Sequence, residues 1–147
     1  MLKENGAEFI LRTYKYEEKG GTSVASRELG VNEHQVIKTL VMEDDRKNPL
    51  LILMHGDNEV STKNLARVLG VKSVEPCDPE TAHRHTGYMV GGISPFGTRK
   101  ALKVYVEASI LELPKIYINA GKRGLLAEMS PQELKRVLNP VTVNVAI

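Results

Sequence analysis

The sequence is short of the residues that build disulfides, cysteine-rich metal centres and membrane spans. It contains a single cysteine, Cys77, from which we expect neither an internal disulfide nor a cysteine-based zinc site. A lone thiol is typical of a reducing, cytoplasmic location. No apolar run approaches the roughly 20 residues of a membrane helix, and the first ten residues lack the apolar segment of a signal peptide. We therefore expect no association with a membrane.

An excess of charge of one sign is also missing. The 20 basic and 18 acidic residues give a net charge of +2, unlike that of a dedicated DNA-coating protein. The cations are nevertheless clustered, and local clusters can contact phosphate groups as well as water. These clusters are Arg99, Lys100 and Lys103; Lys122 and Arg123; Lys135 and Arg136.

The length and patterning predict one domain, residues 1–147, of the α+β class. A chain of 147 residues can bury a sizeable core, and it shows no internal repeat, linker or low-complexity segment. Short helices interrupt the strands irregularly, which favours a strongly curved, barrel-like mixed sheet over a regular βαβ fold. Alternation and apolar runs predict strands at residues 7–14, 36–42, 50–54, 88–93, 102–106, 116–119, 125–129 and 141–147.

Capping residues predict four helices, at residues 22–30, 61–70, 78–87 and 130–139. Thr22 or Ser23, Ser61 and Asp78 are placed to cap the first three at the N-terminus. Ser130 and Glu133 have the spacing of a capping box for the fourth.

Residues 87–100, GYMVGGISPFGTRK, approach two known loop types without matching either. Gly92 and Gly97 have the P-loop spacing, but the lysine that should follow is missing and Pro95 lacks an N–H donor. Ser94 lacks the glycine two residues later that an esterase elbow requires, so a turn-capping hydroxyl is the simpler interpretation. Gly91 and Gly92 could let a ligand approach the backbone and donate to its oxyanion, or could simply form a bulge and a turn.

The histidines do not predict a metal site, and the other reactive side chains each have two interpretations. His83 and His85 are two residues apart on a predicted helix, so they should point to different faces. Cys77 precedes a helix N-terminus, which would stabilise a thiolate, although packing in a loop explains it equally well. Lys38 interrupts an apolar strand face, either as an edge-strand lysine that reaches water or as a cation at the mouth of a pocket.

Three segments together resemble the YbaK family of aminoacyl-tRNA deacylases. They are VIKTLV at 36–41, GYMVGGISPFGTRK at 87–100 and INAGKRGLLAEMSPQEL at 118–134, and FILRTY and ELGV nearer the N-terminus are similar to that family too. The resemblance implies a compact α+β fold shared with the editing domain of prolyl-tRNA synthetases. It also implies hydrolysis, in trans, of the ester of mischarged tRNA, such as Cys-tRNA(Pro) or a tRNA carrying another small residue, without a cofactor.

The resemblance also assigns site residues. It gives Lys38, Gly91 and Gly92 the catalytic positions, because the lysine would meet the acceptor end of the tRNA and the glycine backbone the ester oxygen. The family usually has a serine where this chain has Asn119, which leaves the amino acid that is removed open. Substrate contacts are expected from Tyr14, Thr39, Ile93, Ser94, Pro95, Asn119 and Gly121, and phosphate contacts from Arg99, Lys100, Lys122 and Arg123.

Two other functions remain compatible with the sequence. A module could bind tRNA acceptor ends or prolyl-tRNA synthetase without turnover, and a small-molecule esterase would act on free esters. An editing enzyme needs no strong nucleophile, because the aminoacyl ester is already activated and orientation can suffice. With few basic clusters to read the tRNA body, we expect prolyl-tRNA synthetase to contribute to tRNA selection.

Overall fold

The computed structural model describes residues 2–147, which form eight strands and four α-helices. The strands are β1 (Phe9–Thr13), β2 (Val36–Asp44), β3 (Pro49–His55), β4 (Val74–Pro76), β5 (Lys103–Glu107), β6 (Ile116–Lys122), β7 (Leu125–Met129) and β8 (Val141–Val143). The helices are α1 (Gly21–Leu29), α2 (Thr62–Leu69), α3 (Pro79–Thr86) and α4 (Pro131–Leu138), with short 3₁₀ helices η1 (Glu33–Gln35) and η2 (Ala108–Glu112). Within residues 2–147, no helix has the length and apolar character needed to cross a membrane.

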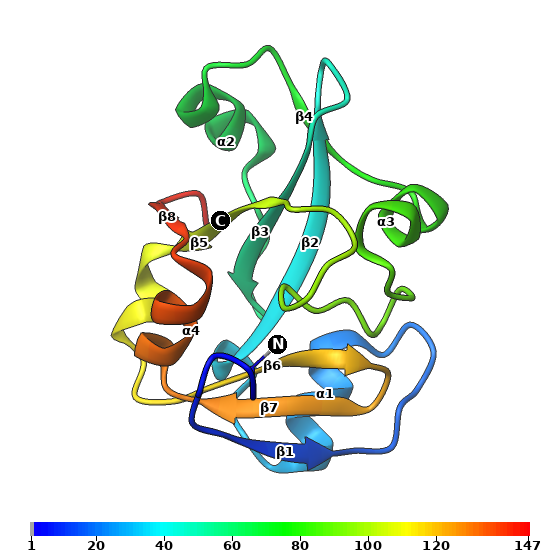
Figure 1. Cartoon of the computed structure of the whole chain (residues 1–147), viewed down its shortest axis with the longest axis vertical. Helices are drawn as coiled ribbons and strands as arrows, with labels where there is room; N and C mark the ends of the chain where they lie inside the picture. The colour runs from blue at the N-terminus through cyan, green and yellow to red at the C-terminus, as the bar shows by residue number, and fades with distance from the viewer. Residues whose placement is uncertain (1) are drawn as a thin grey trace.

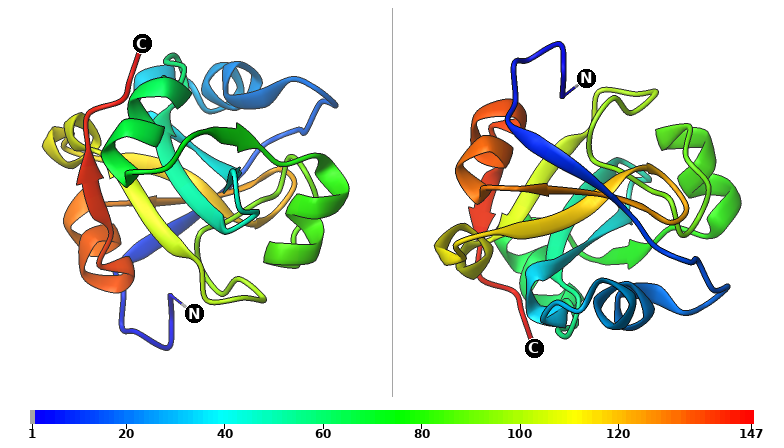
Figure 2. Two further views of the ribbon diagram at one scale, coloured as in Figure 1. Left: turned by 90° about the horizontal axis from the view of Figure 1, so that it is seen from above. Right: turned by 90° about the horizontal axis from the view of Figure 1, so that it is seen from below.

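The strands form one mixed sheet in the order β1-β7-β6-β2-β3-β5-β8, with β4 paired to β2 off this path. The antiparallel hairpin of β2 and β3 is its centre, and β6 and β5 add to the hairpin in parallel on either side. In Figure 1 the hairpin follows the long axis, whereas β1, β6 and β7 cross it at one end. Figure 2 shows the same crossing from above and below. The predicted α+β class with a curved mixed sheet is therefore confirmed.

The hairpin is buried because both of its faces are covered. The side chains of Leu51 and Leu53 point into the larger core cluster, and those of Ile52 and Met54 point into a second cluster that includes Leu65 of α2. All four hairpin residues have no solvent exposure. A third, smaller cluster joins α1 to the start of β2 and to β6 and β7. A strand pair packed on both sides gives the site residues on β2 and β6 a rigid base.

Most predicted elements are confirmed, but the strand predicted at residues 88–93 is wrong. That segment is a loop with Gly91 at a φ of 91°, a conformation outside the β region, and the N–H of Gly92 closes a turn onto the carbonyl of Met89. The loop's apolar residues misled the prediction, since Met89 and Val90 are exposed rather than buried in a sheet.

One predicted helix cap is wrong, and at α4 the Ser130 N-cap is confirmed but the predicted capping box is not formed. Gly20 is the N-cap of α1, and the Thr22 hydroxyl is instead bonded to a carboxylate oxygen of Glu33. At α4, Ser130 accepts from the N–H of Gln132, while the Glu133 carboxylate bonds to the N–H of Glu8 rather than closing a capping box. The Ser61 and Asp78 caps are confirmed.

Candidate functional site

Three segments that are far apart in the sequence meet at one end of the sheet. They are the turn after β1, the loop of residues 87–97 (here the glycine loop) and the β6–β7 hairpin. The N–H of Tyr14 donates to the carbonyl of Gly124 at 3.0 Å, which fixes the first segment to the hairpin. The other contacts are made by the hairpin residues Asn119 and Arg123.

The side chain of Asn119 holds both its own turn and the glycine loop. Its Oδ1 accepts from the N–H groups of Gly121 at 2.6 Å and Lys122 at 3.2 Å. Its Nδ2 donates to the carbonyl of Gly91 at 3.3 Å. An asparagine can do this because its longer side chain carries an acceptor oxygen and a donor nitrogen at separate positions, whereas the serine expected from the resemblance has one hydroxyl closer to the backbone.

Arg123 holds the other side of the glycine loop. Its Nε donates to the carbonyl of Val90 at 2.8 Å, and its guanidinium carbon lies 5.1 Å from the centre of the Tyr16 ring. Arg123 was predicted to contact phosphate, but part of its hydrogen-bonding capacity is committed to the protein.

Glycines make this close packing possible. A Cβ on Gly92 would lie 2.8 Å from the backbone N of Arg123, and one on Gly121 would lie 2.8 Å from the Tyr88 ring. Tyr88 donates its hydroxyl to the carbonyl of Phe96, which closes the loop on itself. The loop and the hairpin are therefore in backbone-level contact, which any side chain at these positions would disturb.

The glycine loop offers one backbone donor of the kind that was predicted. The N–H of Gly92 is used in the turn to Met89, so it is not available to a ligand in this conformation. The N–H of Gly91 has no acceptor within residues 2–147. Of the two predicted oxyanion donors, the structure leaves Gly91.

Lys38 lies beside Asn119 on the same face of the sheet. The parallel register pairs Val36 with Tyr117 and Ile37 with Ile118, so the next residues of the two strands, Lys38 and Asn119, are neighbours. The Lys38 side chain is 20% exposed and its Nζ lies 3.7 Å from a carboxylate oxygen of Glu59. Lys38 is thus a partly buried cation with one distant carboxylate partner.

Thr39, Ile93, Ser94 and Pro95, which were predicted to line the substrate pocket, are turned away from Lys38 or buried. Thr39 follows Lys38 in β2 and so points to the opposite face, where its hydroxyl is the one buried side-chain group without a partner in the described part of the chain. Ser94 has no exposed surface, and its hydroxyl accepts from the N–H of Phe96. Pro95 is buried, and Ile93 packs against the larger core cluster. Ile93, Ser94 and Pro95 are therefore packed on the inner side of the glycine loop.

The predicted phosphate contacts lie against different elements. The backbone N–H groups of Arg99 and Lys100 donate to carbonyls at the end of α3, and Lys100 reaches the His85 ring. Lys122 is exposed at the hairpin, next to Arg123. The hairpin cations, rather than Arg99 and Lys100, are the ones beside Asn119.

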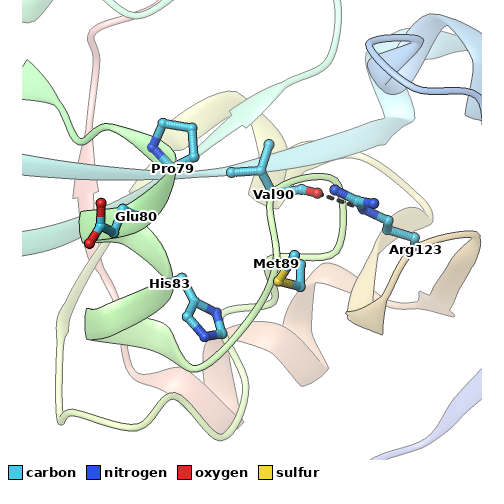
Figure 3. Close-up of a pocket in the computed structure, with 6 residues that line it drawn as sticks. All are labelled: Pro79, Glu80, His83, Met89, Val90 and Arg123. Carbon is cyan, nitrogen blue, oxygen red and sulfur yellow. Dashed lines mark hydrogen bonds between the residues drawn. The ribbon is translucent and has the colours of Figure 1, made fainter.

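A shallow depression of about 290 Å³ lies on the outer side of the glycine loop (Figure 3). Its lining comprises Pro79, Glu80 and His83 of α3, Met89 and Val90 of the loop, and Arg123. Lys38 and Asn119 are not among these residues, so the depression is separate from the face that carries them.

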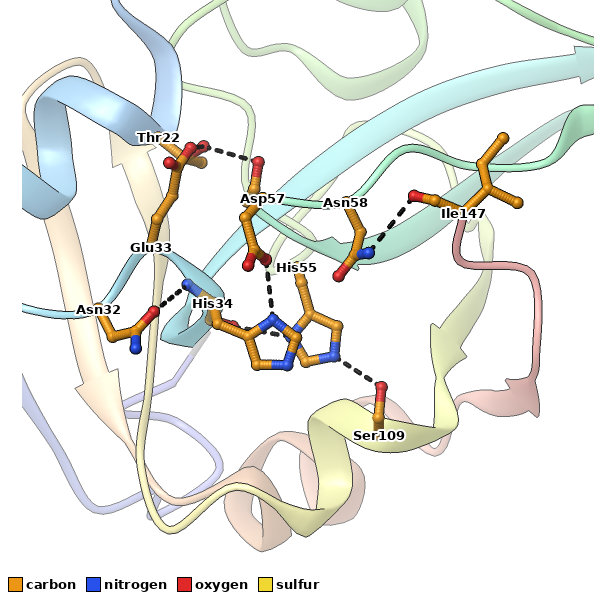
Figure 4. A network of polar contacts seen from close by, with 10 residues as sticks. Thr22, Asn32, Glu33, His34, His55, Asp57, Asn58, Ser109 and Ile147 are labelled. Carbon is orange, nitrogen blue, oxygen red and sulfur yellow. Dashed lines mark hydrogen bonds and ion pairs between the residues drawn. The ribbon is translucent and has the colours of Figure 1, made fainter.

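A stacked pair of histidines, His34 and His55, joins η1, β3 and η2 (Figure 4). The rings of His34 and His55 are stacked with centroids 3.6 Å apart, and Asp57 bonds to His34. His55 is fully buried between the carbonyl of His34 and the hydroxyl of Ser109, each 2.7 Å away. Burial lowers the pKa of His55, so it is neutral near pH 7. The sequence does not predict this histidine pair, because His34 and His55 are 21 residues apart.

Cys77 does not have the stabilised thiolate that its position before α3 suggested. Burial, with the nearby carboxylates of Glu43 and Asp78, raises the pKa of the Cys77 thiol to about 11. Glu43, Cys77 and His85 lie close to one another and form a cluster that the sequence did not predict.

The chain belongs to the aminoacyl-tRNA editing domain family, whose model matches residues 17–137. A protein of Enterococcus faecalis named, provisionally, as the Cys-tRNA(Pro)/Cys-tRNA(Cys) deacylase EbsC is 32% identical over 111 residues, which cover 76% of this chain and 68% of that protein. A proline–tRNA ligase of Streptococcus equi subsp. zooepidemicus is 31% identical over 96 residues, which cover 65% of this chain and 15% of the ligase.

The fold is also found in solved structures. The crystal structure of hypothetical protein APE2540 matches with a TM-score of 0.91 at 25% identity, over 99% of this chain and 96% of that one. A structure described as a candidate trans-editing enzyme for prolyl tRNA synthetase matches with a TM-score of 0.88 at 21% identity, over 99% and 92% of the two chains. The resemblance inferred from the three sequence segments is confirmed.

Proposed function

We propose that this protein hydrolyses the ester bond of mischarged aminoacyl-tRNA in trans, with Cys-tRNA(Pro) as the first substrate to test. Membership of the editing family and the names of the relatives above support this proposal. The observation that carries it is the register of β2 and β6, which makes Lys38 a strand neighbour of Asn119, the residue whose amide holds the glycine loop at the Gly91 carbonyl. We place the activity in the cytoplasm, where charged tRNA is used.

The chemistry requires positioning more than a nucleophile. Water attacks the ester carbonyl, the carbon–oxygen bond to the ribose breaks, and the released hydroxyl takes the proton that water loses. The N–H of Gly91 would stabilise the negative charge that develops on the carbonyl oxygen. The Lys38 ammonium would hold the acceptor end of the tRNA by its phosphate, with Glu59 as the counter-ion that it leaves.

Contacts beyond the acceptor end would come from the exposed Lys122 and from a partner. We propose prolyl-tRNA synthetase as that partner, because the same sequence type occurs as a segment within proline–tRNA ligases. Such an arrangement would bring the correct tRNA to a domain that reads only its end.

A panel of mischarged tRNAs tests the proposal. The protein is incubated with each tRNA, with and without prolyl-tRNA synthetase, and loss of the amino acid is followed. We expect acceleration for at least one pair, and a loss of roughly 10²–10³-fold in kcat/KM for Lys38→Ala. Lys63→Ala, an exposed lysine on α2, is the matched control and should retain full activity.

Three outcomes would redirect the proposal. Retention of tRNA without turnover of any pair would indicate a binding module, and turnover of free amino-acid esters alone would indicate a small-molecule esterase. Full activity in Lys38→Ala would remove the role assigned to that lysine.

A further inference from the structure

Glu43, Cys77 and His85 bring three different metal-binding side chains to one place. Glu43 is near the end of β2, Cys77 lies in the connection from β4 to α3, and His85 is in the last turn of α3. One ligand atom from each lies within 4.8 Å of the others. We propose that this cluster binds a zinc-type divalent cation, independently of the editing function.

The spacing is close to that of a coordination shell. Zinc bonds of about 2.0–2.3 Å in a tetrahedron place ligand atoms about 3.3–3.8 Å apart. His85 Nε2 and Glu43 Oε2 are already 3.3 Å apart. The Cys77 sulfur must approach by no more than about 1–1.5 Å, which a rotation about its side-chain bond can supply.

The donor set suits zinc better than calcium or magnesium. Thiolate and imidazole are ligands for borderline and soft cations, whereas hard cations prefer oxygen alone. Three protein ligands leave a fourth tetrahedral position for water, as in zinc sites that remain open. The Glu43 side chain is 17% exposed and that of His85 6%, so the cluster is shielded but reachable.

Backbone hydrogen bonds fix the three ligands relative to one another. The N–H of Cys77 donates to the carbonyl of Val41 at 2.9 Å, and β4 pairs with β2 from Met42 to Asp44. The carbonyl of His85 accepts from the N–H of Lys100 at 3.1 Å. A site whose ligands are preorganised in this way loses little chain entropy when a cation binds.

Lys100 holds the cluster in its metal-free form. Its Nζ lies 2.9 Å from His85 Nδ1. Because an ammonium group can only donate, Nδ1 is the acceptor and the ring proton is on Nε2, facing Glu43. A cation at Nε2 requires the tautomer with the proton on Nδ1, so the exposed Lys100 side chain must turn to solvent. The Cys77 thiol gives its proton to water, and the two anionic ligands then neutralise the cation.

Titration with Co²⁺ tests the site directly, because a cobalt–thiolate bond gives a charge-transfer absorption in the near ultraviolet. We expect this band in the full-length protein, its loss in Cys77→Ser, and an affinity at least about tenfold weaker in His85→Gln. His83→Gln is the matched control, since His83 is an exposed histidine of the same helix, and it should bind cobalt normally. Absence of the band at millimolar cobalt, or its survival in Cys77→Ser, would overturn the proposal.

A second variant, Lys100→Gln, tests the contact of Lys100 with His85 in the metal-free protein. It also provides a test of the cation site if Cys77→Ser does not fold. Lys100→Gln removes the competing ammonium, and we expect it to bind Co²⁺ several-fold more tightly than the wild-type protein. Lys103→Gln changes the same charge on β5, where the lysine lies over the Tyr105 ring, and should leave the affinity unchanged. Equal affinities in the two lysine variants would count against a cation at His85. Zinc should also raise the thermal midpoint of the wild-type protein but not of Cys77→Ser.

Discussion

The side-chain amide of Asn119 donates to the carbonyl oxygen of Gly91 at 3.3 Å, so that a residue of the β6–β7 hairpin fixes a glycine 28 positions earlier in the chain. The same side chain also accepts from two N–H groups of its own turn. Asn119 thereby holds the Gly91–Gly92 peptide, while the preceding peptide, which carries the N–H of Gly91, is held through the Val90 carbonyl by Arg123. The orientation of the proposed oxyanion donor therefore depends on the hairpin.

Replacement of Asn119 should affect turnover more than stability. Asn119→Ala removes the contact to Gly91, and we expect kcat/KM for deacylation to fall about tenfold, while the free energy of unfolding falls by about 1 kcal/mol. Asn119→Ser keeps an acceptor for the turn but is too short to reach Gly91, so its kcat/KM should be intermediate. Steady-state deacylation and urea unfolding measure the two effects. Equal kcat/KM in all three proteins would show that the clamp does not position the ester.

Gly91→Ala should lower deacylase activity more than the same change at another glycine with a positive φ. Gly91 has a φ of 91°, and a Cβ there would collide with the Tyr16 hydroxyl. Gly70 has a φ of 71° at the end of α2 with open space around it, so Gly70→Ala costs only the conformational strain of about 1–2 kcal/mol. We expect Gly91→Ala to lose most deacylase activity and Gly70→Ala to keep it, as measured at a temperature where both are folded. Comparable activity in the two variants would argue against close packing of the loop.

The salt dependence of tRNA binding should distinguish the role of Lys122 from that of Arg123. Lys122→Gln removes an exposed charge, so we expect weaker tRNA binding at low salt and a defect that fades as salt screens the wild-type contact. Arg123→Gln also removes the hydrogen bond to Val90, so its defect should persist at high salt. Binding isotherms across a salt series distinguish the two. Parallel salt slopes for both variants would show that Arg123 acts only by its charge.

Folding stability should fall on mild acidification because of His55. Its pKa is lowered in the folded protein by burial, against about 6.5 in the unfolded chain. The unfolded chain therefore binds a proton first, and the stability present above about pH 6.5 is lost as the pH falls toward the folded pKa. Urea unfolding at about pH 7.5 and 5.5 should show a smaller decrease for His55→Gln, which cannot titrate, than for wild type. An equal decrease would show that groups other than His55 account for it.

The sequence predicted the elements whose signals are local. Ser61 and Asp78 cap their helices as expected, and the apolar run of β3 is buried on both faces. The segment at 88–93 failed because apolar residues can serve an exposed loop as well as a strand, and nothing local shows that Gly91 has a positive φ.

The site was predictable only in part for the same reason. The resemblance supplied Lys38, Gly91 and Asn119. It also placed Thr39 in the substrate pocket, but Thr39 and Lys38 are consecutive strand residues and lie on opposite faces of β2, each of which is covered by its own core cluster. The cluster of Glu43, Cys77 and His85 depends on pairing of β2 with β4, which links residues that no local pattern connects.

The pairing of β1 with β7 has a consequence for how the protein is made. Arg12 and Glu128, joined across these strands by a 2.8 Å ion pair, are 116 residues apart. The N–H of Tyr14 likewise donates to the carbonyl of Gly124, 110 residues later. During synthesis the first strand must wait until the hairpin has emerged, because contacts of such high sequence separation form late. The turn, loop and hairpin that make up the proposed editing site would then assemble together, after most of the chain has left the ribosome.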